Sequence, residues 1–587
     1  MADIEQLVAA LRTGGVDRGV HVGLALVTGV GLGLAVDDRT WALPNVDPVT
    51  VVAEIEHVLH PRWVWWSQET AAILVAAGVR VAMCWDITAV DRLIFGGWRS
   101  DPAHAWARLQ GLKGESIPSV GQLDFLATHV DDGDDENPVR PDGHLRAEWA
   151  AGAWSRTPQR LALWAATALA AAAHQHNQLS SIGSTPLSGS SGNIGNPVAT
   201  ARSESAAEAL CAELAFDGLP LSIAAAETVI ASFVGPRPTS DKEAAERRRQ
   251  RDEAVRVHAP AGDTTDLRNP AQVKALLTRI GLDVPDTRAW RLEEMRSAHP
   301  LVDALLIWRK AERVLTTYGF SWLDENVGDD GRLRGAWSGS DGAAGRMTAQ
   351  AGLHNMPADM RSAVIAEPGY VFVRADLGQI EPRVLAAISG DQSLAKATVA
   401  DDLYAPVAQR LGVERAVAKI AVLAAMYGQT SGTAGQALRG LESAYPVAMR
   451  YLHDAAAKGE SGTNVRTFGG RLVRMGETPY GLSDRDERAM AASRGRYARN
   501  AMVQGAAAEL FKVWAVTVRA RSAPTDARIV LCLHDELLLH VRIEHADDIV
   551  LLLDTCLQEA AHRWSNGGPV RFVTDTSIIH RWSDAKS

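Results

Sequence analysis

The chain has 587 residues, of which 47% are hydrophobic and 22% charged, and its formal net charge at pH 7 is −10. This length and composition predict a soluble globular protein with two to four domains. The cysteines lie far apart without a CxxC pair, so neither a zinc site nor a disulfide framework is indicated. They are Cys84, Cys211, Cys532 and Cys556.

The acidity is concentrated at the N-terminal end of the chain. Residues 1–177 hold 21 acidic and 13 basic side chains, which leaves a balance of only −2 for residues 178–587. A negative overall charge does not favour nucleic-acid binding, but a nearly neutral C-terminal part can still carry a local basic channel. The most nearly continuous apolar run, residues 161–173, is too short to span a bilayer, and the acidic start of the chain does not fit an export signal.

The N-terminal third mixes strand-like and helical patterns. Residues 20–35 predict strands, and residues 51–59 and 69–77 predict helices, so we expect an α/β domain over residues 1–177. A stretch rich in Gly, Ser and Pro follows, and it predicts a flexible linker over residues 178–205.

Helical patterns dominate after the linker. We expect helices over residues 206–233, 242–257 and 301–319, and a further helix that begins at the Asn269-Pro270 pair. The second of these helices carries four arginines: Arg247, Arg248, Arg249 and Arg251. Glutamates lie among them, so the pattern fits both a solvated helix and a face that binds phosphates.

One carboxylate stands where a predicted strand gives way to a helix. Residues 371–375 predict a strand, Asp376 follows it, and residues 379–389 predict a helix. A carboxylate at a strand end can reach a metal or a substrate, although Asp376 alone could also cap the helix that follows.

Two further carboxylates lie between the apolar runs of residues 529–541. His534, Asp535 and Glu536 separate the runs, and such a triplet alone is more often an exposed hairpin turn. Burying two adjacent negative charges is costly unless a cation balances them. If Asp376 and Asp535 lie on neighbouring strands, they can hold a pair of Mg²⁺ ions for an in-line phosphoryl displacement.

Residues 414–429 predict a helix with one functional stripe. Side chains of interest recur every four residues: Arg415, Lys419, Leu423 and Tyr427. This spacing places them on one face of the helix. Two cations and an aromatic ring on one face suit a triphosphate and a base, although an isolated stripe of this kind is more often a solvated face with the aromatic in the core.

Together these stretches resemble motifs A, B and C of the family A DNA polymerases, the group of bacterial DNA polymerase I. The motif A residues are Asp376, Gln379, Ile380, Glu381 and Arg383, those of motif B are Arg415, Lys419, Tyr427 and Gly428, and those of motif C are His534, Asp535 and Glu536. Residues 345–357 and 496–512 are similar to two further stretches of the family. Five matches in the family's order, within about residues 206–582, are a specific signal.

The resemblance implies a role for each matching position. Asp376 and Asp535 would bind the metal ions, and Glu536 would act at the primer end. The side chains expected around the incoming dNTP are Arg415, Lys419, Tyr427, Glu381 and Gln379, with Glu381 excluding ribonucleotides. The residues expected along the DNA are Arg346, His534, Arg496, Asn500, Gln504 and Gly428. The arginines of residues 242–257 would lie against duplex phosphates.

Several positions depart from the family pattern. Leu423 stands where motif B usually has an aromatic residue, and motif A has Leu377 and Gly378 where Tyr and Ser are common, followed by an unusual Pro382. Residues 401–412 lack the histidine with which many members contact phosphate, and Tyr404 is the nearest candidate. These changes bear on fidelity and efficiency rather than on the reaction.

Residues 1–177 resemble the 3′–5′ exonuclease domain of the same family, but without its metal ligands. No acid lies between Asp17 and Asp37, where a strand would carry two carboxylates, and Thr70 stands where a further aspartate belongs. Asp86 and Asp91 are expected to be surface residues. We therefore expect a degenerate domain without proofreading, and we hypothesise that it braces the polymerase domain.

These observations predict an α/β N-terminal exonuclease-like (RNase H-like) domain and an α+β right-hand polymerase with an antiparallel palm sheet. The expected bounds are thumb 206–330, palm 331–400 and 505–587, and fingers 401–504. The expected function is template-directed DNA synthesis in replication or repair, with two Mg²⁺ ions (Mn²⁺ as a substitute) and release of pyrophosphate. The expected partners are primer-template DNA and dNTPs, with no membrane, for a cytoplasmic, nucleoid-associated monomer.

Two other functions stay open at this point. A single-subunit RNA polymerase shares the palm and similar motifs, although Glu381 and the QIE sequence argue against it. A catalytically inactive DNA-binding scaffold is the second alternative. The residues that argue against it are Asp376, Asp535, Arg415 and Lys419.

Overall fold

A computed structural model describes residues 2–97, 99–119, 136–184, 195–342, 344–428, 434–477, 479, 481 and 483–585. The chain forms two compact units. The first comprises Met1–Asp217, Ala336–Thr348 and Val373–Ile578, and the second comprises Gly218–Gly335, Ala349–Phe372 and Ile579–Ser587. In the described part of the chain, no helix combines the length and the apolar character that crossing a bilayer requires.

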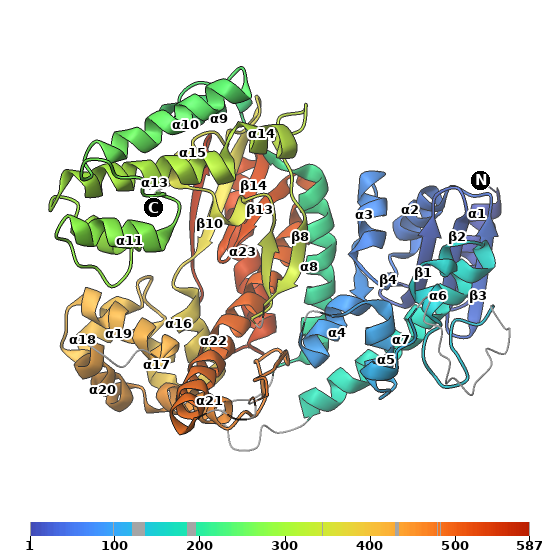
Figure 1. Ribbon diagram of the computed structural model, residues 1–587. Helices are drawn as coiled ribbons and strands as arrows, with labels where there is room; N and C mark the ends of the chain where they lie inside the picture. Colours follow the sequence, from blue (N-terminus) through green and yellow to red (C-terminus); the bar gives the residue numbers. More distant parts are fainter. Residues whose placement is uncertain are drawn as a thin grey trace. The chain divides into compact units, whose positions relative to one another are not determined.

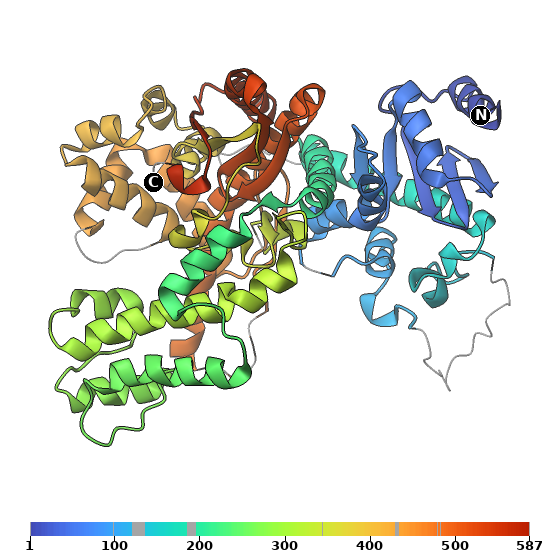
Figure 2. The ribbon, with the colours of Figure 1, turned by 90° about the horizontal axis from the view of Figure 1, so that it is seen from above.

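The N-terminal residues of the first unit form a mixed sheet with helices on both faces (Figure 1). The strand order is β3-β2-β1-β4-β5, in which β2 runs antiparallel to β1 and β3, and β4 runs parallel to β1 and β5. The strands are β1 (His21–Val27), β2 (Gly31–Val36), β3 (Arg39–Pro44), β4 (Arg62–Trp65) and β5 (Cys84–Asp86). The helices are α1 (Ala2–Thr13), α2 (Pro48–Leu59), α3 (Gln68–Ala76), α4 (Ile87–Phe95), α5 (Pro102–Leu109), α6 (Ala147–Ala150) and α7 (Pro158–Ser184). Figure 2 shows these strands, in blue, from above.

Successive side chains of β1 point to opposite faces of the sheet, and each face packs into a different core. One face enters a core with α1, α2 and α3 through Val22, Leu24 and Leu26. On the other face Ala25 enters a core with α7. Gly23 also lies on this face, and a Cβ there would come within 2.3 Å of the carbonyl oxygen of Ala165 in α7. Helix α7 therefore covers the backbone of β1 directly, and both faces of this strand are closed.

The prediction that Asp86 and Asp91 are surface residues is wrong, since both are fully buried. Asp86 caps α4 by accepting a hydrogen bond from the Ala89 N–H at 2.9 Å, and it accepts another from the Trp65 indole at 3.1 Å. Asp91 forms an ion pair with Arg108. Local sequence pattern does not show such partners, because Trp65 and Arg108 lie 21 and 17 residues away.

The predicted linker is shorter than expected at both ends. Helix α7 continues to Ser184 and α8 (Pro197–Asp217) begins at Pro197, so the two helices occupy most of residues 178–205. Burial of Leu179 stabilises the end of α7 despite its Ser and Gly content. The Asn196 side chain accepts a hydrogen bond from the Ala199 N–H at 3.0 Å, which caps the start of α8.

The second unit is mainly helical. It begins at Gly218, and the predicted helix over 206–233 is two helices, of which only the second belongs to this unit. Gly218 has φ 67 and Pro220 follows in a short strand, which together interrupt the helix. The elements are β6 (Leu219–Pro220), α9 (Ile223–Val234), α10 (Asp241–Arg256), α11 (Pro270–Arg279), α12 (Ala289–Glu294), α13 (Pro300–Tyr318), α14 (Phe320–Asn326), β7 (Arg332–Leu333) and α15 (Ala358–Arg361). Helix α13 contacts α9, α10 and α12, which Figure 2 shows in green.

Most of the arginines of α10 pair with carboxylates of their own unit. Arg247 and Arg249 form ion pairs with glutamates of the same helix. Arg248 forms an ion pair with Glu312 of α13. These pairs favour the interpretation of α10 as a solvated helix over that of a phosphate-binding face.

A second sheet forms the core of the C-terminal part of the first unit. Its order is β13-β14-β10-β15, with β13 antiparallel to β14, and Figure 1 shows β10, β13 and β14 side by side. The strands are β10 (Tyr370–Leu377), β13 (Arg528–Leu533), β14 (Glu536–Arg542) and β15 (Thr574–Ile579). The long helices α22 (Asp484–Ser522) and α23 (Ala546–Trp564) contact each other and strands of this sheet. The four strands lie within the residues for which the sequence predicts the palm, and the sheet is called the palm sheet below.

A group of helices connects β10 to α22. They are α16 (Ile380–Ser389), α17 (Gln392–Ala397), α18 (Tyr404–Leu411), α19 (Arg415–Tyr427), α20 (Ala434–Ala444) and α21 (Pro446–Glu460). The short strands of this unit are β8 (Trp337–Asp341), β9 (Arg346–Ala349), β11 (Val465–Arg466) and β12 (Leu472–Val473). Helix α19 contacts α18, α20 and α22, so the predicted functional stripe belongs to a packed helical layer.

Candidate active site

Neighbouring strands bring the two predicted metal ligands together. Asp376 lies near the end of β10, and Asp535 lies in the turn between β13 and β14. The backbone N–H of Leu377 donates a hydrogen bond to the carbonyl oxygen of Asp535 at 2.9 Å. This bond ties the end of β10 to the turn, so both aspartates stand at one edge of the palm sheet, as the sequence predicts.

The turn that carries Asp535 requires an unusual backbone. Leu533 and Glu536 pair across the hairpin, which leaves His534 and Asp535 as a two-residue turn. His534 has φ 43, a value that costs free energy for a residue with a side chain. Burial and the charge of Arg346 lower the pKa of His534, which favours a neutral imidazole.

A buried arginine that none of the sequence motifs includes lies among these carboxylates. Arg374 precedes Asp376 by two residues on β10, so both side chains share one face of the sheet. Its guanidinium lies 3.0 Å from Asp376, 2.8 Å from Glu536 and 3.8 Å from Asp575 of β15. The two-residue period of a strand predicts that Arg374 and Asp376 share a face. It does not predict that Glu536 and Asp575, from other strands, lie close to Arg374.

One arginine does not balance the negative charge of this edge. Burial and the nearby charge of Asp535 raise the pKa of Asp376 to about 7. Burial also raises the pKa of Asp535. Within the described residues no group of three or more His, Cys, Asp or Glu side chains forms a metal cage. Mg²⁺ takes one or two carboxylates and keeps other oxygen ligands, so the two aspartates fit this ion.

Gln379 joins the end of β10 to the helical layer. Its amide nitrogen donates a hydrogen bond to Asp402 at 3.0 Å, and its amide oxygen accepts one from the Leu403 N–H at 2.8 Å. Asp402 in turn forms an ion pair with Arg415. The amide of Gln379 is thus engaged within the protein, where it positions Asp402 and Arg415 rather than facing a nucleotide directly.

Helix α19 presents its two cations to solvent. Arg415 and Lys419 are exposed, whereas Leu423 and Tyr427 are half-buried. The side chains follow one stripe along the helix, as their spacing predicts. The exposed cations are accessible to a polyphosphate, and the aromatic ring lies at the other end of the stripe.

A hydrogen-bonded group links motif A, motif B and β9. Glu381 of α16 accepts a hydrogen bond from the Tyr427 hydroxyl at 2.8 Å and lies 3.2 Å from the guanidinium of Arg346. Gln504 of α22 also forms a hydrogen bond with Tyr427. The structure therefore brings four predicted site residues from distant segments into one network.

Helix α22 carries the residues predicted to face the template. Arg496, Asn500 and Gln504 lie four residues apart on this helix. Gly428, with φ 69, ends α19 close to Arg496, and a Cβ there would come within 3.0 Å of the arginine side chain. Among the described residues the buried Oδ1 of Asn500 has no hydrogen-bond partner, so this face retains an unused acceptor.

Two residues near the motifs serve the fold instead. Arg383 is fully buried and donates hydrogen bonds to the backbone carbonyl oxygens of Gly378, Thr398, Ala400, Asp401 and Arg571. Tyr404 is also buried, and the guanidinium of Arg415 lies 5.8 Å from its ring centre. The structure therefore does not support Tyr404 as a substitute for the missing phosphate-binding histidine.

Comparison with known families agrees with this geometry. The model of the family described as DNA polymerase family A matches residues 239–584. The chain belongs to DNA polymerase family A. Similar members of family A include the DNA polymerase I of Chloroflexus aurantiacus, 29% identical over 341 residues, and that of Deinococcus radiodurans, 27% identical over 369 residues.

These family A relatives are longer than the present chain. The matches cover 51% and 56% of this chain but only 36% and 37% of the two relatives. Among solved structures, the POL domain of Pol1 from M. smegmatis, in complex with DNA primer-template and dNTP, superposes with a TM-score of 0.70. It is 22% identical, and the match covers 99% of this chain and 98% of that domain. This similarity establishes a common fold over nearly the whole chain.

Proposed function

We propose that the chain is a DNA-templated DNA polymerase that adds deoxynucleotides to a primer 3′-hydroxyl and releases pyrophosphate. The observation that carries the proposal is the pair Asp376 and Asp535 at the palm edge, linked through Gln379 and Glu381 to the cationic helix α19. The names of the relatives and the DNA and dNTP bound by the similar POL domain support it. We propose that the protein is a cytoplasmic monomer associated with the nucleoid. Its proposed role is DNA replication or repair.

Asp376 and Asp535 are the residues that would hold two Mg²⁺ ions, or Mn²⁺ in their place. Such ions, when bound, neutralise the charge that develops on the transferred phosphoryl group and on the attacking and leaving oxygens. In this chain Glu536 holds Arg374, and Arg374 holds the carboxylate of Asp376, which fixes the direction in which that carboxylate faces. Glu536 also lies beside Asp535, so we assign it to the primer end.

The incoming nucleotide would lie along α19. Arg415 and Lys419 contact its phosphates, and Tyr427 stacks near the templating base. Glu381 occupies the space where a ribose would place its 2′-hydroxyl. Because Tyr427 and Arg346 both hold Glu381, its carboxylate keeps one position, which is what selection against a hydroxyl requires.

The DNA would contact side chains on both sides of this site. Arg346 and His534 lie near the primer strand and the nascent pair. The template side is assigned to Arg496, Asn500 and Gln504, together with Gly428, which lies against the side chain of Arg496. Cationic contacts of this kind weaken as the salt concentration rises.

We further propose that residues 1–177, whose last helix α7 continues to Ser184, are a degenerate RNase H-like exonuclease domain without proofreading activity. An exonuclease of this family would carry carboxylates on β1, but one face of this strand is packed with leucine and valine and the other lies against α7. Asp86 and Asp91 are occupied by structural partners. No space or ligand set for two metal ions is therefore evident on this strand.

Extension of a labelled, recessed primer tests the polymerase proposal. Wild type with Mg²⁺ and dNTPs is expected to extend the primer, and Asp535→Asn is expected to slow extension by roughly two to three orders of magnitude, because charge stabilisation dominates phosphoryl transfer. Asp548→Asn, at an exposed position of α23, is the matched control. Binding of DNA without extension by wild type would instead support an inactive scaffold.

Two further reactions test for proofreading and for RNA polymerase activity. A primer with a mismatched 3′ end, incubated without dNTPs, is expected to stay intact, and its shortening would contradict the loss of proofreading. Replacement of dNTPs by ribonucleotides is expected to abolish most extension. Efficient extension with ribonucleotides would favour an RNA polymerase and contradict the role of Glu381.

A further inference from the structure

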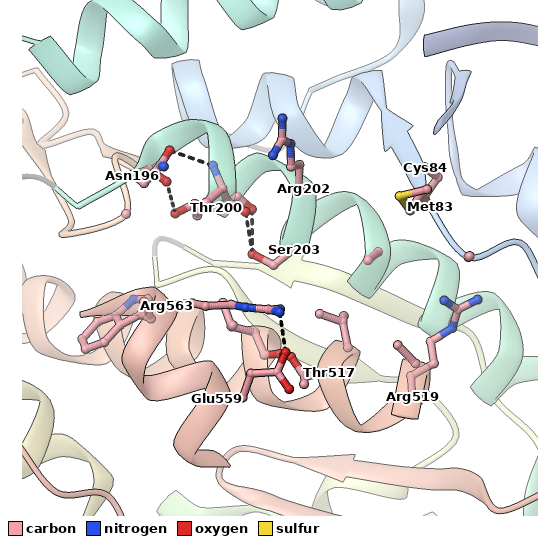
Figure 3. A pocket seen from close by; sticks show the side chains of 18 of the residues that line it. Met83, Cys84, Asn196, Thr200, Arg202, Ser203, Thr517, Arg519, Glu559 and Arg563 are labelled. Carbon is pink, nitrogen blue, oxygen red and sulfur yellow. Dashed lines mark hydrogen bonds and ion pairs between the residues drawn. The ribbon is translucent and has the colours of Figure 1, made fainter. Parts of the chain in front are cut away.

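A cavity of about 610 Å³ lies within the first compact unit, away from the polymerase motifs. Arg62 and Cys84, the first residues of β4 and β5, form one side of it. Figure 3 shows the other side chains around it: Arg202 and Ser203 of α8, Arg519 of α22, and Glu559 and Arg563 of α23. The cavity therefore joins the amino ends of two parallel N-terminal strands to three helices of the polymerase part.

Positive charge dominates this cavity, which is lined by six arginines and a single carboxylate, Glu559. Arg521 and Arg563 both pair with Glu559, and Arg519 pairs with Glu213 of α8. Across the part of the chain that the structure describes, no carboxylate pairs with the other three: Arg18, Arg62 and Arg202. Half of the arginines around the cavity thus lack a counter-charge.

The charge of Arg202 acts on Arg62. Arg62 is half-buried and donates hydrogen bonds to two neutral groups, the Cys84 carbonyl at 3.1 Å and the Met83 sulfur at 3.6 Å. Burial and the charge of Arg202 lower the pKa of Arg62. Burial and the charge of Arg62 also lower the pKa of the neighbouring His21 to about 4. Arg18 and Arg202 are exposed and Arg62 is half-buried, so a polyanion can reach all three guanidinium groups and would reduce the repulsion between them.

Aromatic rings form another part of the cavity wall. Trp564 is 6% exposed, and within the described residues its indole N–H has no hydrogen-bond acceptor. The ring of Phe468, which also lines the cavity, lies 4.7 Å from that of Trp564 between centroids. The ring of Phe468 is half-buried, so a flat ligand in the cavity would pack against it.

We propose that this cavity binds a nucleoside polyphosphate, with its phosphates on Arg18, Arg62 and Arg202 and its base beside Phe468 and Trp564. The volume falls within the range of small-molecule sites. Guanidinium groups suit phosphate oxygens, and bases stack on aromatic side chains. Because the walls come from the N-terminal domain and from α8, α22 and α23, the bound nucleotide stabilises their packing. This site is separate from the proposed polymerase site and does not depend on polymerase activity.

Titration of the full chain with ATP, in EDTA and without DNA, tests the proposal by calorimetry. Chelation weakens triphosphate binding at the palm, and Lys419→Ala weakens it further without touching the cavity. Wild type and Lys419→Ala are expected to bind one ATP with similar affinity. Arg18→Gln combined with Arg202→Gln is expected to raise the Kd at least tenfold. Arg12→Gln, at an exposed position of α1 outside the cavity, is the matched control.

A second comparison tests the base-binding part. Phe468→Leu removes the half-buried aromatic ring of the cavity wall, so it is expected to weaken ATP binding several-fold and to leave binding of inorganic tripolyphosphate unchanged. The melting temperature of each variant without ligand shows whether it folds. Absence of ATP binding in EDTA, wild-type affinity in the Arg18 and Arg202 double variant, or tripolyphosphate binding as tight as ATP binding would each overturn the proposal. Primer extension by the double variant is expected at the wild-type rate, which separates this test from that of the polymerase.

Discussion

The charges at the edge of the palm sheet do not balance within the protein. Arg374 shares its guanidinium between Asp376 and Glu536, while Asp535 and Asp575 add negative charge nearby. Functional sites commonly retain such repulsion because binding of substrate or cation relieves it. Arg374 therefore stabilises the site when no cation is bound, because it pairs with two of its carboxylates.

Arg374→Gln is expected to lower the melting temperature in EDTA and to enlarge the rise in melting temperature that Mg²⁺ causes. The neutral amide leaves carboxylates unpaired, at a cost of about 1–3 kcal/mol, and the edge then offers more negative charge to a divalent cation. Scanning calorimetry with and without Mg²⁺ measures both effects. Arg528→Gln, which breaks a partly exposed pair with Asp526, is the control. An equal Mg²⁺ effect in wild type and Arg374→Gln would contradict this role.

A carboxylate of α22 leads to a pH-dependent prediction. Glu509 is 1% exposed and accepts a hydrogen bond from the Gly469 N–H at 2.8 Å, and burial raises its pKa to about 7. Between the ordinary pKa of glutamate and about pH 7, the folded protein keeps a proton that the unfolded chain releases. The contribution of this group to stability therefore falls as the pH rises through that window.

Glu509→Gln removes this titration because its side chain is always neutral. The variant is expected to melt higher than wild type at pH 8, by an amount that corresponds to about 3 kcal/mol at most, and the difference is expected to shrink as the pH falls to 5. Melting temperatures of the variant and of wild type, measured between pH 5 and pH 8, test this pH dependence. Glu54→Gln, at an exposed position of α2, is the control. A difference that stays constant with pH would show that the titration of Glu509 is not its cause.

At the scale of elements, α8 is attached to the polymerase part by a buried ion cluster. The Glu204 carboxylate lies 2.6 Å from Arg471 and 2.5 Å from Lys512 of α22. All three side chains are buried. Such a cluster is stable only when every member keeps a partner, because an isolated charge in the interior has no compensation. The helix that the sequence assigns partly to a linker is thus an integral part of the fold.

Glu204→Gln is expected to destabilise the protein strongly, by roughly 3–5 kcal/mol, because it leaves Arg471 and Lys512 as unpaired buried cations. Addition of Lys512→Met to this variant removes one of those cations and is expected to restore part of the loss. Urea unfolding of the two single variants and the double variant measures the coupling. Strictly additive effects would mean that Glu204 and Lys512 do not stabilise one another.

At the scale of the whole molecule, the N-terminal domain contacts the polymerase part of its unit through main-chain groups. Three arginines donate hydrogen bonds to its carbonyl oxygens: Arg519 to Val81, Arg466 to Ile94, and Arg474 to Phe95. An ion pair between Arg92 and Glu208 adds to them. These contacts agree with the hypothesis that the domain braces the polymerase part.

Deletion of residues 1–195 leaves α8 in place and removes the N-terminal domain. The shortened protein is expected to fold and to extend a primer, but to melt several degrees lower than the full chain, because the arginines above lose their acceptors. Deletion of residues 1–217 also removes Glu204 and Glu213, and this protein is expected to be insoluble. An unchanged melting temperature after the first deletion would exclude the bracing role.

The sequence predicted the elements around the motifs well, because their signals are local. The strand before Asp376, the helix of Arg415 and the hairpin of Asp535 all follow from patterns within a few residues. The burial of Asp86 and Tyr404 was not predicted, since their partners come from distant segments. The predicted linker is too long because the Ser and Gly content of residues 178–184 does not favour a helix. Tertiary packing nevertheless extends α7 to Ser184.

By itself the sequence determined the motif residues, their order and the local elements that carry them, since spacing along a strand or helix decides which side chains share a face. Only the tertiary structure decided what balances those charges. Arg374 among the carboxylates, the contact of Gln379 with Asp402 and the unpaired arginines around the cavity all depend on residues far apart in the chain. Ion pairs and cavities form between segments that are far apart in the sequence. Local sequence patterns do not predict which of these segments come together when the chain folds.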